Sequence, residues 1–402
     1  MTKRSSQRAL QRDFLIFFLA LALAGQWIVL HGLLHVSLSL VWRTVLPGLA
    51  ILGAAALLSW GAELAQLEIT QALALAFLAL VAVLPEYAVD VYLAWTAAKD
   101  PAYVAFATAN MTGANRLLIG LGWSTVLLAY WLVTRRRAIE VHPAQRLELV
   151  TLLAATGYAF LLAFKRSLSL IDTAVFFGLF AVYIRRASRG QPEEPGLAGP
   201  PERLAHLPRR WRRAVTVLLF LVPAGAIFAS AEPFATGLLE SARHLGIEEF
   251  LLIQWLAPLA SETPEFAVAV VFALRRNPRA GLGTLVSSKV NQWTLLVGML
   301  PLAYAVSGLS LSPMALDARQ SEEIFLTAAQ SLLGVVILAN LRFGLGEALL
   351  LIGLFLLQFV IPSPEIRTLL AVGYLVLAAG YLTRPAFRRS LLELLRVGVR
   401  SS

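Results

Sequence analysis

Apolar runs of about 20 residues recur along the whole chain, and they limit the possible folds more than any other feature. A run of this length is what an α-helix needs to cross the hydrocarbon of a bilayer. The composition agrees, since 58% of the 402 residues are hydrophobic and only 14% are charged, whereas soluble proteins carry about 25% charged residues. The sequence therefore predicts an all-α polytopic membrane protein.

About twelve segments are expected to span the membrane. The first, Phe14 to Leu34, is too long for a signal peptide and lacks a small-residue cleavage site, so we expect it to remain as a helix. The predicted helices cover residues 13–34, 44–64, 69–98, 103–134, 147–164, 168–185, 213–243, 249–274, 280–308, 323–341, 344–361 and 366–383.

The basic residues predict the orientation of these helices. The net charge of +10 could suggest a nucleic-acid partner. With a cytoplasmic N-terminus, however, the segments on that side hold 25 Lys and Arg residues and the opposite side holds 7. This bias follows the positive-inside rule and predicts cytoplasmic termini, a location in the cell (inner) membrane and no nucleic-acid partner. The basic, amphipathic tail segment FRRSLLELLR is expected to contact membrane lipid.

The residue types available in the spans restrict what they can bind. The chain has no cysteine, and none of its five histidines lies in the polar segments described below. Any ion bound within the membrane would therefore have oxygen ligands, which favours Na⁺, Ca²⁺, Mg²⁺ or a proton over zinc or copper. No nucleophile–base set or zinc motif is present in the sequence, so neither an enzyme nor a cofactor is expected.

A segment rich in Pro, Gly and charge, Arg185 to Arg213, divides the chain into two similar halves. LPEYAVDVYLAWTAAKDPAY precedes VAFATANMTGANRLLIGLGW in the first, and TPEFAVAVVFALRRNPRA precedes GLGTLVSSKVNQWTLLVGML in the second. Five spans per half would invert the second copy, and inverted repeats place their substrate near the bilayer midplane. The predicted parts are a tail with an extra helix (1–43), a first repeat (44–186), a cytoplasmic linker (187–212), a second repeat (213–361), and an extra helix with a basic tail (362–402).

Glu86 and Glu265 each follow a proline within a predicted span. Proline removes a backbone donor and frees carbonyl oxygens upstream. A carboxylate in hydrocarbon is costly, by roughly 2.5 kcal/mol or more on insertion scales, so its presence needs a reason. Carboxylates and bare carbonyls placed where two repeats meet form an oxygen cage for a hard cation. The alternative is a kinked helix in which each Glu pairs with an inward-facing base.

The helix after each turn supplies further oxygen atoms. Small residues such as Ala109, Gly113 and Ala114 are explained by close helix packing. The amides are not, because they need partners in hydrocarbon. The polar residues of these two helices are Thr108, Asn110, Thr112, Asn115, Thr284, Ser287, Ser288, Asn291 and Gln292.

In these residues the chain resembles the sodium/calcium exchanger superfamily of cation antiporters, as a divergent member. The family's repeats have the approximate pattern GTSLPE followed by GNxxGSNxxN. The likeness covers about residues 44–361, and its specific part lies in 81–123 and 260–301. The resemblance implies ten core helices in two inverted repeats, with paired glutamates that coordinate Ca²⁺ and Na⁺, or a proton in the proton-coupled branch. It implies Glu86 and Glu265 as those glutamates, Ser288 as the serine of GSN and Gln292 as the closing Asn or Asp.

The chain departs from this pattern in several places. VAVLPE (Val81 to Glu86) keeps LPE without the hydroxyl residues, and ASETPE has Ser261 and Glu262 at the Thr and Ser positions. In the first polar helix, counting from Glu86 places Thr108 to Asn110 at GSN, whereas GAN (Gly113 to Asn115) resembles GSN directly. We prefer the counting and keep the second register as an alternative. The expected cation ligands are Glu86, Glu265, Ser288, Asn110, Gln292, Ser261, Glu262, Asn115 and Asn291.

Two bases lie in or near the expected site. Lys289 replaces the Asn of GSN, and Arg116 lies inside a predicted span. The four acids of the motif segments exceed these two bases by two charges, which would attract a divalent ion or two protons. In one arrangement Arg116 pairs with Asp90 and Lys289 with Glu262. In the other, Lys289 stands in for a bound cation, and its ammonium is released when substrate or protons arrive.

The predicted function is that of a secondary cation antiporter, which exchanges Ca²⁺ or a related cation for Na⁺ or H⁺ by alternating access. Two alternatives remain at this point. One is an altered-site, proton-coupled family member that carries no divalent ion, and the other is a non-transporting membrane scaffold. The sequence leaves the coupling ion and the oligomeric state open.

Overall fold

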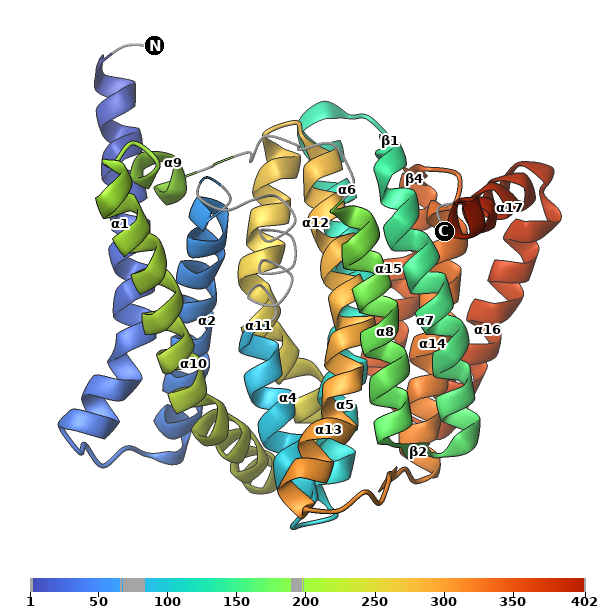
Figure 1. Cartoon of the computed structure of the whole chain (residues 1–402), viewed down its shortest axis with the longest axis horizontal. Helices are drawn as coiled ribbons and strands as arrows, with labels where there is room; N and C mark the ends of the chain where they lie inside the picture. The colour runs from blue at the N-terminus through green and yellow to red at the C-terminus, as the bar shows by residue number, and fades with distance from the viewer. Residues whose placement is uncertain (1–2, 66, 68–83, 189–196, 198, 401–402) are drawn as a thin grey trace. The chain divides into compact units, whose positions relative to one another are not determined.

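The computed structural model describes residues 3–65, 67, 84–188, 197 and 199–400. The predicted helix 69–98 lies partly outside these residues, as do Val81, Ala82 and Val83 of the VAVLPE segment. The described chain is almost entirely helical, with four short strands, which confirms the predicted all-α class in its coarse form. It divides into two compact units, whose elements are labelled in Figure 1.

The first unit consists of Met1–Tyr92 and Ser188–Pro264. Its elements are α1 (Lys3–Trp27), the π-helix η1 (Ile28–Leu33), α2 (Leu40–Ala65), the first part of α4 (Leu84–Ala97), α9 (Pro200–Leu204), α10 (Arg209–Leu245) and the first part of α11 (Glu249–Leu274).

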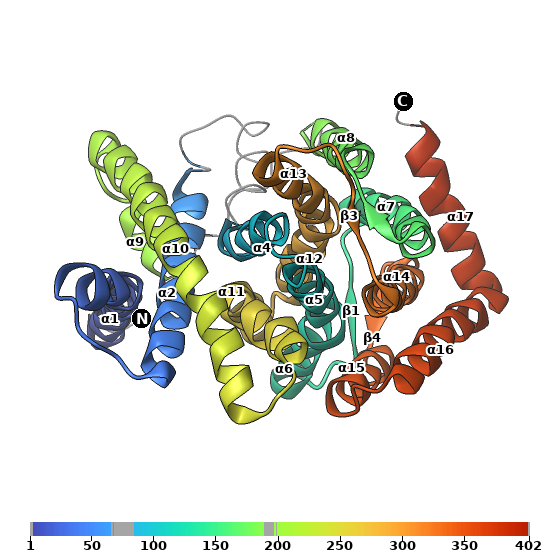
Figure 2. The ribbon, with the colours of Figure 1, turned by 90° about the horizontal axis from the view of Figure 1, so that it is seen from below.

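Close packing of α2 against α10 forms the centre of this unit, and Figure 2 shows the two helices side by side. A Cβ atom at Gly48 would lie 2.8 Å from the ring of Phe234, and one at Gly237 would lie 2.7 Å from the hydroxyl of Thr44. Neither would fit. Small residues therefore let the two backbones approach each other, as is common between membrane helices.

The second unit consists of Leu93–Ala187 and Glu265–Ser402. Besides the ends of α4 and α11, its first half contains α5 (Tyr103–Leu117), the π-helix η2 (Leu118–Trp123), α6 (Ser124–Thr134), β1 (Ala138–Glu140), η3 (Pro143–Gln145), α7 (Arg146–Lys165), β2 (Ser167–Leu168) and α8 (Leu170–Ala187). Its second half contains α12 (Pro278–Asn291), the π-helix η4 (Gln292–Leu296), α13 (Val297–Gly308), β3 (Met314–Ala315), α14 (Ala318–Leu338), β4 (Arg342–Gly344), α15 (Leu345–Val360), α16 (Pro364–Thr383) and α17 (Pro385–Arg400).

These two halves share one order of elements. In each, a polar helix continues through a π-helix into a further helix, and strand, helix, strand and helix follow. β1 pairs antiparallel with β4, and β2 pairs antiparallel with β3. If the two halves are exchanged, β1 corresponds to β3 and β4 to β2, so the pair β1–β4 becomes the pair β3–β2. Both two-stranded ribbons therefore follow one pattern.

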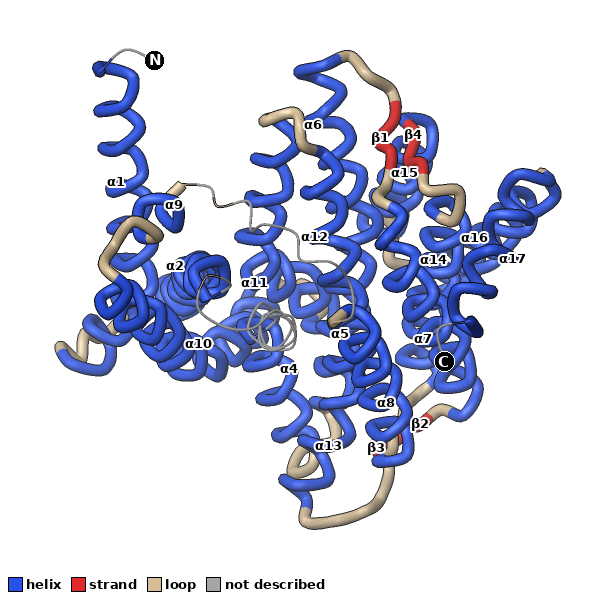
Figure 3. Tube along the Cα trace, turned by 45° about the horizontal axis from the view of Figure 1, so that its top comes forward, coloured by secondary structure: helices blue, strands red, loops and turns tan. Residues whose placement is uncertain are grey.

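The two ribbons lie at opposite ends of the helices α7 and α14, which pack against each other (Figure 3). β1 precedes α7 and β2 follows it, while β3 precedes α14 and β4 follows it. A loop of one half is thus joined to a loop of the other half at each end of this helix pair. Inverted repeats would produce this arrangement.

Each π-helix of the second unit contributes one tryptophan to the core. Trp123 in η2 is fully buried, and a Cβ atom at Gly334 of α14 would lie 3.0 Å from its ring. Trp293 in η4 is 1% exposed, and its Nε1 donates a hydrogen bond to Thr156 Oγ1 of α7 at 3.2 Å. The π segment of each half therefore packs on the long helix of the other half.

Seven helices of the described chain are long and apolar enough to cross a membrane, with an eighth if the two parts of α11 form one span. α11 is bent between Thr263 and Glu265, where the sequence predicts a proline-broken helix. Other predicted spans fall outside this count for physical reasons, since α15 has only 16 residues and α8 carries Asp172, Arg185 and Arg186. The number twelve stays a prediction.

The ribbons allow a test of sidedness, because the chain contains no cysteine. Ala144 near β1 and Ser310 near β3 are both exposed. We expect Ala144→Cys to react with a membrane-impermeant maleimide only in inside-out vesicles, and Ser310→Cys only in right-side-out vesicles, because the loop around Ala144 is basic. Labelling of both positions from one side would contradict the inverted arrangement.

Candidate functional site

Two of the expected ligands, Glu265 and Ser288, are in contact. The Ser288 hydroxyl donates a hydrogen bond to the Glu265 carboxylate, with an oxygen–oxygen distance of 2.6 Å. This short distance is typical of a hydroxyl that donates to a carboxylate. Ser288 is buried and Glu265 is half-buried. The pair offers carboxylate and hydroxyl oxygens, and hard cations prefer oxygen ligands.

The hairpin of α11 and α12 positions this contact. The Asn277 side chain caps α12 by accepting a hydrogen bond from the Ala280 N–H at 3.4 Å. Gly281 faces the Ala269 carbonyl so closely that a Cβ atom would overlap with it. The two helices therefore lie backbone to backbone near the turn, and Ser288 reaches the carboxylate on the neighbouring helix.

Asn291 and Gln292 lie where α12 passes into the π-helix η4. They are 5% and 0% exposed, and the Oδ1 atom of Asn291 has no hydrogen-bond partner among the described residues. π-helical turns change the direction of side chains and occur often at functional sites. Both amides remain candidate ligands.

The polar residues of α5 fall into two groups. Thr108 and Thr112 donate their hydroxyl hydrogens to carbonyls one turn earlier in the same helix, at 2.8 and 2.7 Å. Asn110 and Asn115 are 1% and 0% exposed. The Asn115 Nδ2 atom donates to the Met111 carbonyl at 2.8 Å, which leaves the Oδ1 atom of Asn115 available to another helix.

Lys289 of α12 is the group that binds this oxygen. Its Nζ atom donates to Asn115 Oδ1 at 2.7 Å and to the Asn115 carbonyl at 3.3 Å. It also lies 4.3 Å from the centre of the Trp293 ring, and the residue is fully buried. These described contacts come from neutral oxygens and an aromatic face. Such contacts suit an ammonium group, and both predicted arrangements of Lys289 stay predictions.

Arg116 forms a buried ion pair with Glu323 of α14, at 2.7 Å, and donates to Gln358 Oε1 at 3.3 Å. Arg116 and Glu323 are each 2% exposed. The sequence analysis named Asp90 as one possible partner and did not single out Glu323. Arg367 of α16 lies 3.6 Å from the same carboxylate. The signal in the sequence for these partners is a charged residue close to or within an apolar run, as at Glu323 and Arg367.

Three buried acids of the motif segments lie in the first unit. Glu86 and Asp90 lie one turn apart on α4, with 2% and 0% exposure, and Glu262 on α11 is 2% exposed. Ser261 donates to carbonyls of its own helix at 3.3 and 3.2 Å. Buried carboxylates need a partner, a proton or a cation. Glu86 and Glu265 belong to different units, so their pairing stays a prediction.

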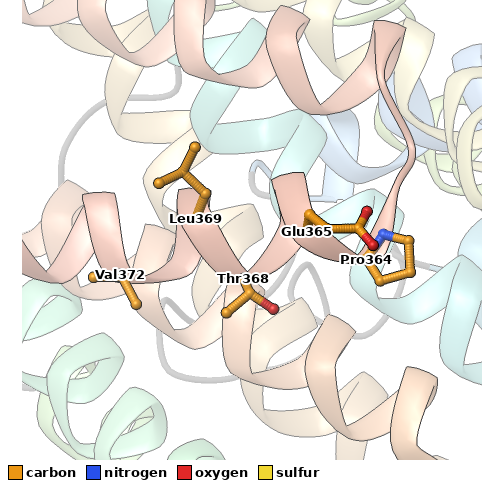
Figure 4. Close-up of a pocket in the computed structure, with 5 residues that line it drawn as sticks. All are labelled: Pro364, Glu365, Thr368, Leu369 and Val372. Carbon is orange, nitrogen blue, oxygen red and sulfur yellow. The ribbon is translucent and has the colours of Figure 1, made fainter.

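Other possible sites in the described residues offer less. They contain no group of three or more His, Asp or Glu residues able to hold a metal ion. A hollow of about 560 Å³ on α16 is lined by five residues, drawn as sticks in Figure 4: Pro364, Glu365, Thr368, Leu369 and Val372. It has a single carboxylate, and Leu369 is 63% exposed. This hollow therefore lacks the oxygen set that a hard cation requires.

Comparison with known proteins identifies what the chain is similar to. The family profile described as "Sodium/calcium exchanger protein" matches residues 38–188 and 215–363. An H⁺/Ca²⁺ exchanger CAX of known crystal structure is 42% identical, with a TM-score of 0.93, and the match covers 97% of this chain and 98% of that one.

Two more distant proteins agree. "Putative antiporter CaxA" of Alkalimonas amylolytica is 24% identical over 269 residues, which cover 65% of this chain and 76% of that protein. The sodium-calcium exchanger NCX_Mj has the same fold, with a TM-score of 0.53 at 18% identity, and the match covers 80% of this chain and 97% of that one.

The ion pair of Arg116 allows a stability test. Glu323→Gln would leave Arg116 buried without its carboxylate, and we expect this to cost roughly 3–5 kcal/mol of folding free energy. In the control Glu393→Gln, which removes the more exposed pair with Arg146, the cost should be about 0–1 kcal/mol. The measurement is thermal unfolding in detergent followed by tryptophan fluorescence. Equal shifts for both variants would show that Glu323 does not compensate Arg116.

Proposed function

The chain belongs to the sodium/calcium exchanger family, and on that basis we propose that it is a secondary antiporter exchanging Ca²⁺ or a related cation for H⁺ by alternating access. The observation that carries this proposal is the 2.6 Å contact between Ser288 and Glu265. It joins the acid of the Pro-Glu segment to the serine of the polar helix, the two parts of the exchanger pattern that the sequence keeps.

The chemistry of this contact suits reversible cation binding. With no cation present, the Ser288 hydroxyl donates to the carboxylate and lowers the cost of burying it. A Ca²⁺ ion would take both oxygens as ligands, and the hydroxyl hydrogen would turn to another acceptor. A proton on Glu265 would restore a neutral, hydrogen-bonded pair. One carboxylate can therefore hold either ion but not both, which is the requirement for exchange.

We place Glu86 opposite Glu265 as the second carboxylate of this site, with the amides of Asn110, Asn291 and Gln292 nearby. Three observations support the inverted repeats that this placement needs. The family profile matches one segment in each half of the chain. The halves share an order of elements, and their ribbons exchange when the halves are exchanged. The proposal includes five spans per repeat and one extra helix at each end, twelve in all.

H⁺ is the proposed coupling ion for two reasons. The buried Lys289 opposes the binding of additional cations near the polar helices, and the similar protein with 42% identity is an H⁺/Ca²⁺ exchanger. Lys289 also favours the second candidate function, in which protons are coupled to a substrate other than a divalent ion. The four acids of the motif segments, of which three are buried and Glu265 is half-buried, favour the divalent ion.

We further propose that the protein lies in the cell membrane with both termini in the cytoplasm. The basic helix α17 would then lie on the inner leaflet. Its Phe387 and Leu394 are buried against the protein, whereas Leu392 and Leu395 are about half exposed. Exposed leucines between arginines suit the boundary between acyl chains and anionic headgroups.

The glutamates provide the first test. Glu265→Gln and Glu86→Gln in sealed proteoliposomes should reduce Ca²⁺ flux to background, because an amide can neither balance the ion's charge nor exchange a proton. Glu249→Gln at the start of α11, where the side chain is half-buried and paired with Arg243, is the matched control and should leave the flux unchanged. Flux at the parental rate in Glu265→Gln would contradict the proposed site.

The serine provides a graded test. Ser288→Ala removes one oxygen and leaves the carboxylate, so we expect the KM for Ca²⁺ to rise roughly tenfold with a smaller change in the maximal rate. Ser287→Ala, one position earlier on the same helix, is the control. An unchanged KM in Ser288→Ala would show that the hydroxyl is not a Ca²⁺ ligand.

Imposed gradients separate the candidate functions. We expect an outward H⁺ gradient to drive Ca²⁺ uptake and an outward Na⁺ gradient at equal pH to drive none. Uptake driven by the Na⁺ gradient alone would show that Na⁺ is the coupling ion, and the antiport function would stand. Proton flux without any Ca²⁺ movement would instead support the second candidate function.

A further inference from the structure

The exchanger pattern has an amide where this chain has Lys289, next to the serine that contacts Glu265. Consecutive residues of an α-helix point about 100° apart. Ser288 therefore faces α11, while Lys289 faces α5 and reaches Asn115. The substitution puts a lysine ammonium one residue away from the hydroxyl of the proposed site.

The surroundings of this ammonium have the character of a cation site. Its described contacts are the amide oxygen and the carbonyl oxygen of Asn115, at 2.7 and 3.3 Å, and the face of Trp293 at 4.3 Å. Two neutral oxygens and an aromatic face would equally suit a desolvated monovalent cation. The amide oxygen is held in place, because the Asn115 Nδ2 atom donates to the Met111 carbonyl.

The helix that presents these oxygens is also anchored on its other side. Arg116, the residue after Asn115, is bound to Glu323 at 2.7 Å, and its carbonyl accepts a hydrogen bond from Gln330 at 3.3 Å. Asn115 is therefore unable to withdraw from Lys289 without disturbing a buried ion pair. The ammonium is attached to the same chain, so it competes at a high effective concentration with any ion from solution.

We propose that Lys289 is a tethered cation that occupies a monovalent-cation position formed by the two oxygens of Asn115, and that it thereby prevents Na⁺ from acting as the coupling ion. Lys289 is then a specificity-determining residue. The inference rests on the proposed Ca²⁺ antiport. It assigns the choice of coupling ion to one side chain outside the pair Glu265 and Ser288, which continues to bind Ca²⁺ or a proton.

The experiment replaces Lys289 by the residue of the family pattern. Lys289→Asn is reconstituted into proteoliposomes, and Ca²⁺ uptake is driven by a pH gradient with equal NaCl or equal choline chloride on both sides. In the parent, Na⁺ should have no effect. In Lys289→Asn, Na⁺ should compete and raise the KM for Ca²⁺ by roughly tenfold. An outward Na⁺ gradient at equal pH should now drive Ca²⁺ uptake.

A matched control exists in the chain. Lys99 also lies over a tryptophan four residues away, at 5.7 Å from the centre of the Trp95 ring, but it is exposed. Lys99→Asn should behave as the parent in every assay. The double variant Lys289→Asn with Asn115→Ala should lose the Na⁺ response, because the amide oxygen that would bind Na⁺ is then missing.

A second neutral variant covers the case in which Lys289→Asn does not accumulate as a folded protein. Lys289→Gln removes the charge and keeps a hydrogen-bond donor for Asn115, and it should show the same Na⁺ competition. Na⁺ competition in the parent, or a folded neutral variant that transports Ca²⁺ without any Na⁺ response, would overturn the inference and leave Ca²⁺ antiport intact. If the parent protein moved no Ca²⁺ under either gradient, this result would instead contradict the proposed function.

Discussion

A charge buried in a low-dielectric interior must be compensated where it lies, and this requirement governs the second unit. Lys289 and Arg116 place two positive charges in polar helices where the exchanger pattern has none. Lys289 is held by Asn115, and Arg116 by Glu323. Because Asn115 and Arg116 are consecutive, α5 is tied to α12 through one residue and to α14 through the next. The two contacts that compensate charge therefore also fix the position of the helix that offers oxygens to the site.

The backbone framework is regular while the chemistry on it differs between the halves. Strand pairs, π-helices and buried tryptophans recur in both halves. The serine hydroxyl that donates a hydrogen bond to the glutamate does not recur. Counting from Glu86 places Ala109 where the second half has Ser288, and the alternative register places Ala114 there. Either register leaves Glu86 without a serine at the equivalent position. The repeat pattern thus predicts where the acids lie, and individual side chains determine which hydrogen-bond donor each acid has.

The sequence was sufficient for the parts that follow a pattern. Apolar run length predicts the helical membrane class, and the Pro-Glu and polar-helix motifs predict Glu265 and Ser288 as ligands of one site; the structure brings these two side chains into contact. The partner of Arg116 could not be predicted. Glu323 lies about two hundred residues away, on a helix without any motif, and only the packing of α14 against α5 brings it to Arg116. Lys289 was recognised as a departure, but its acceptor depends on the rotation of α5, which no spacing rule supplies. The pairing of Glu86 with Glu265 rests on the repeat pattern alone.

The pairing of Arg116 with Glu323 changes the charge balance of the proposed site. In the sequence alone, four motif acids stand against two bases, and a divalent ion would neutralise the difference. With Arg116 compensated by Glu323, the same count for the proposed site has one base, Lys289, against the four acids Glu86, Asp90, Glu262 and Glu265. A bound Ca²⁺ ion then leaves one negative charge over, which is costly in a buried site unless that acid binds a proton. In the proposed site, Ca²⁺ would therefore bind beside one protonated acid and displace the two further protons that neutralise the site in its absence, and this displacement is exchange of Ca²⁺ against protons.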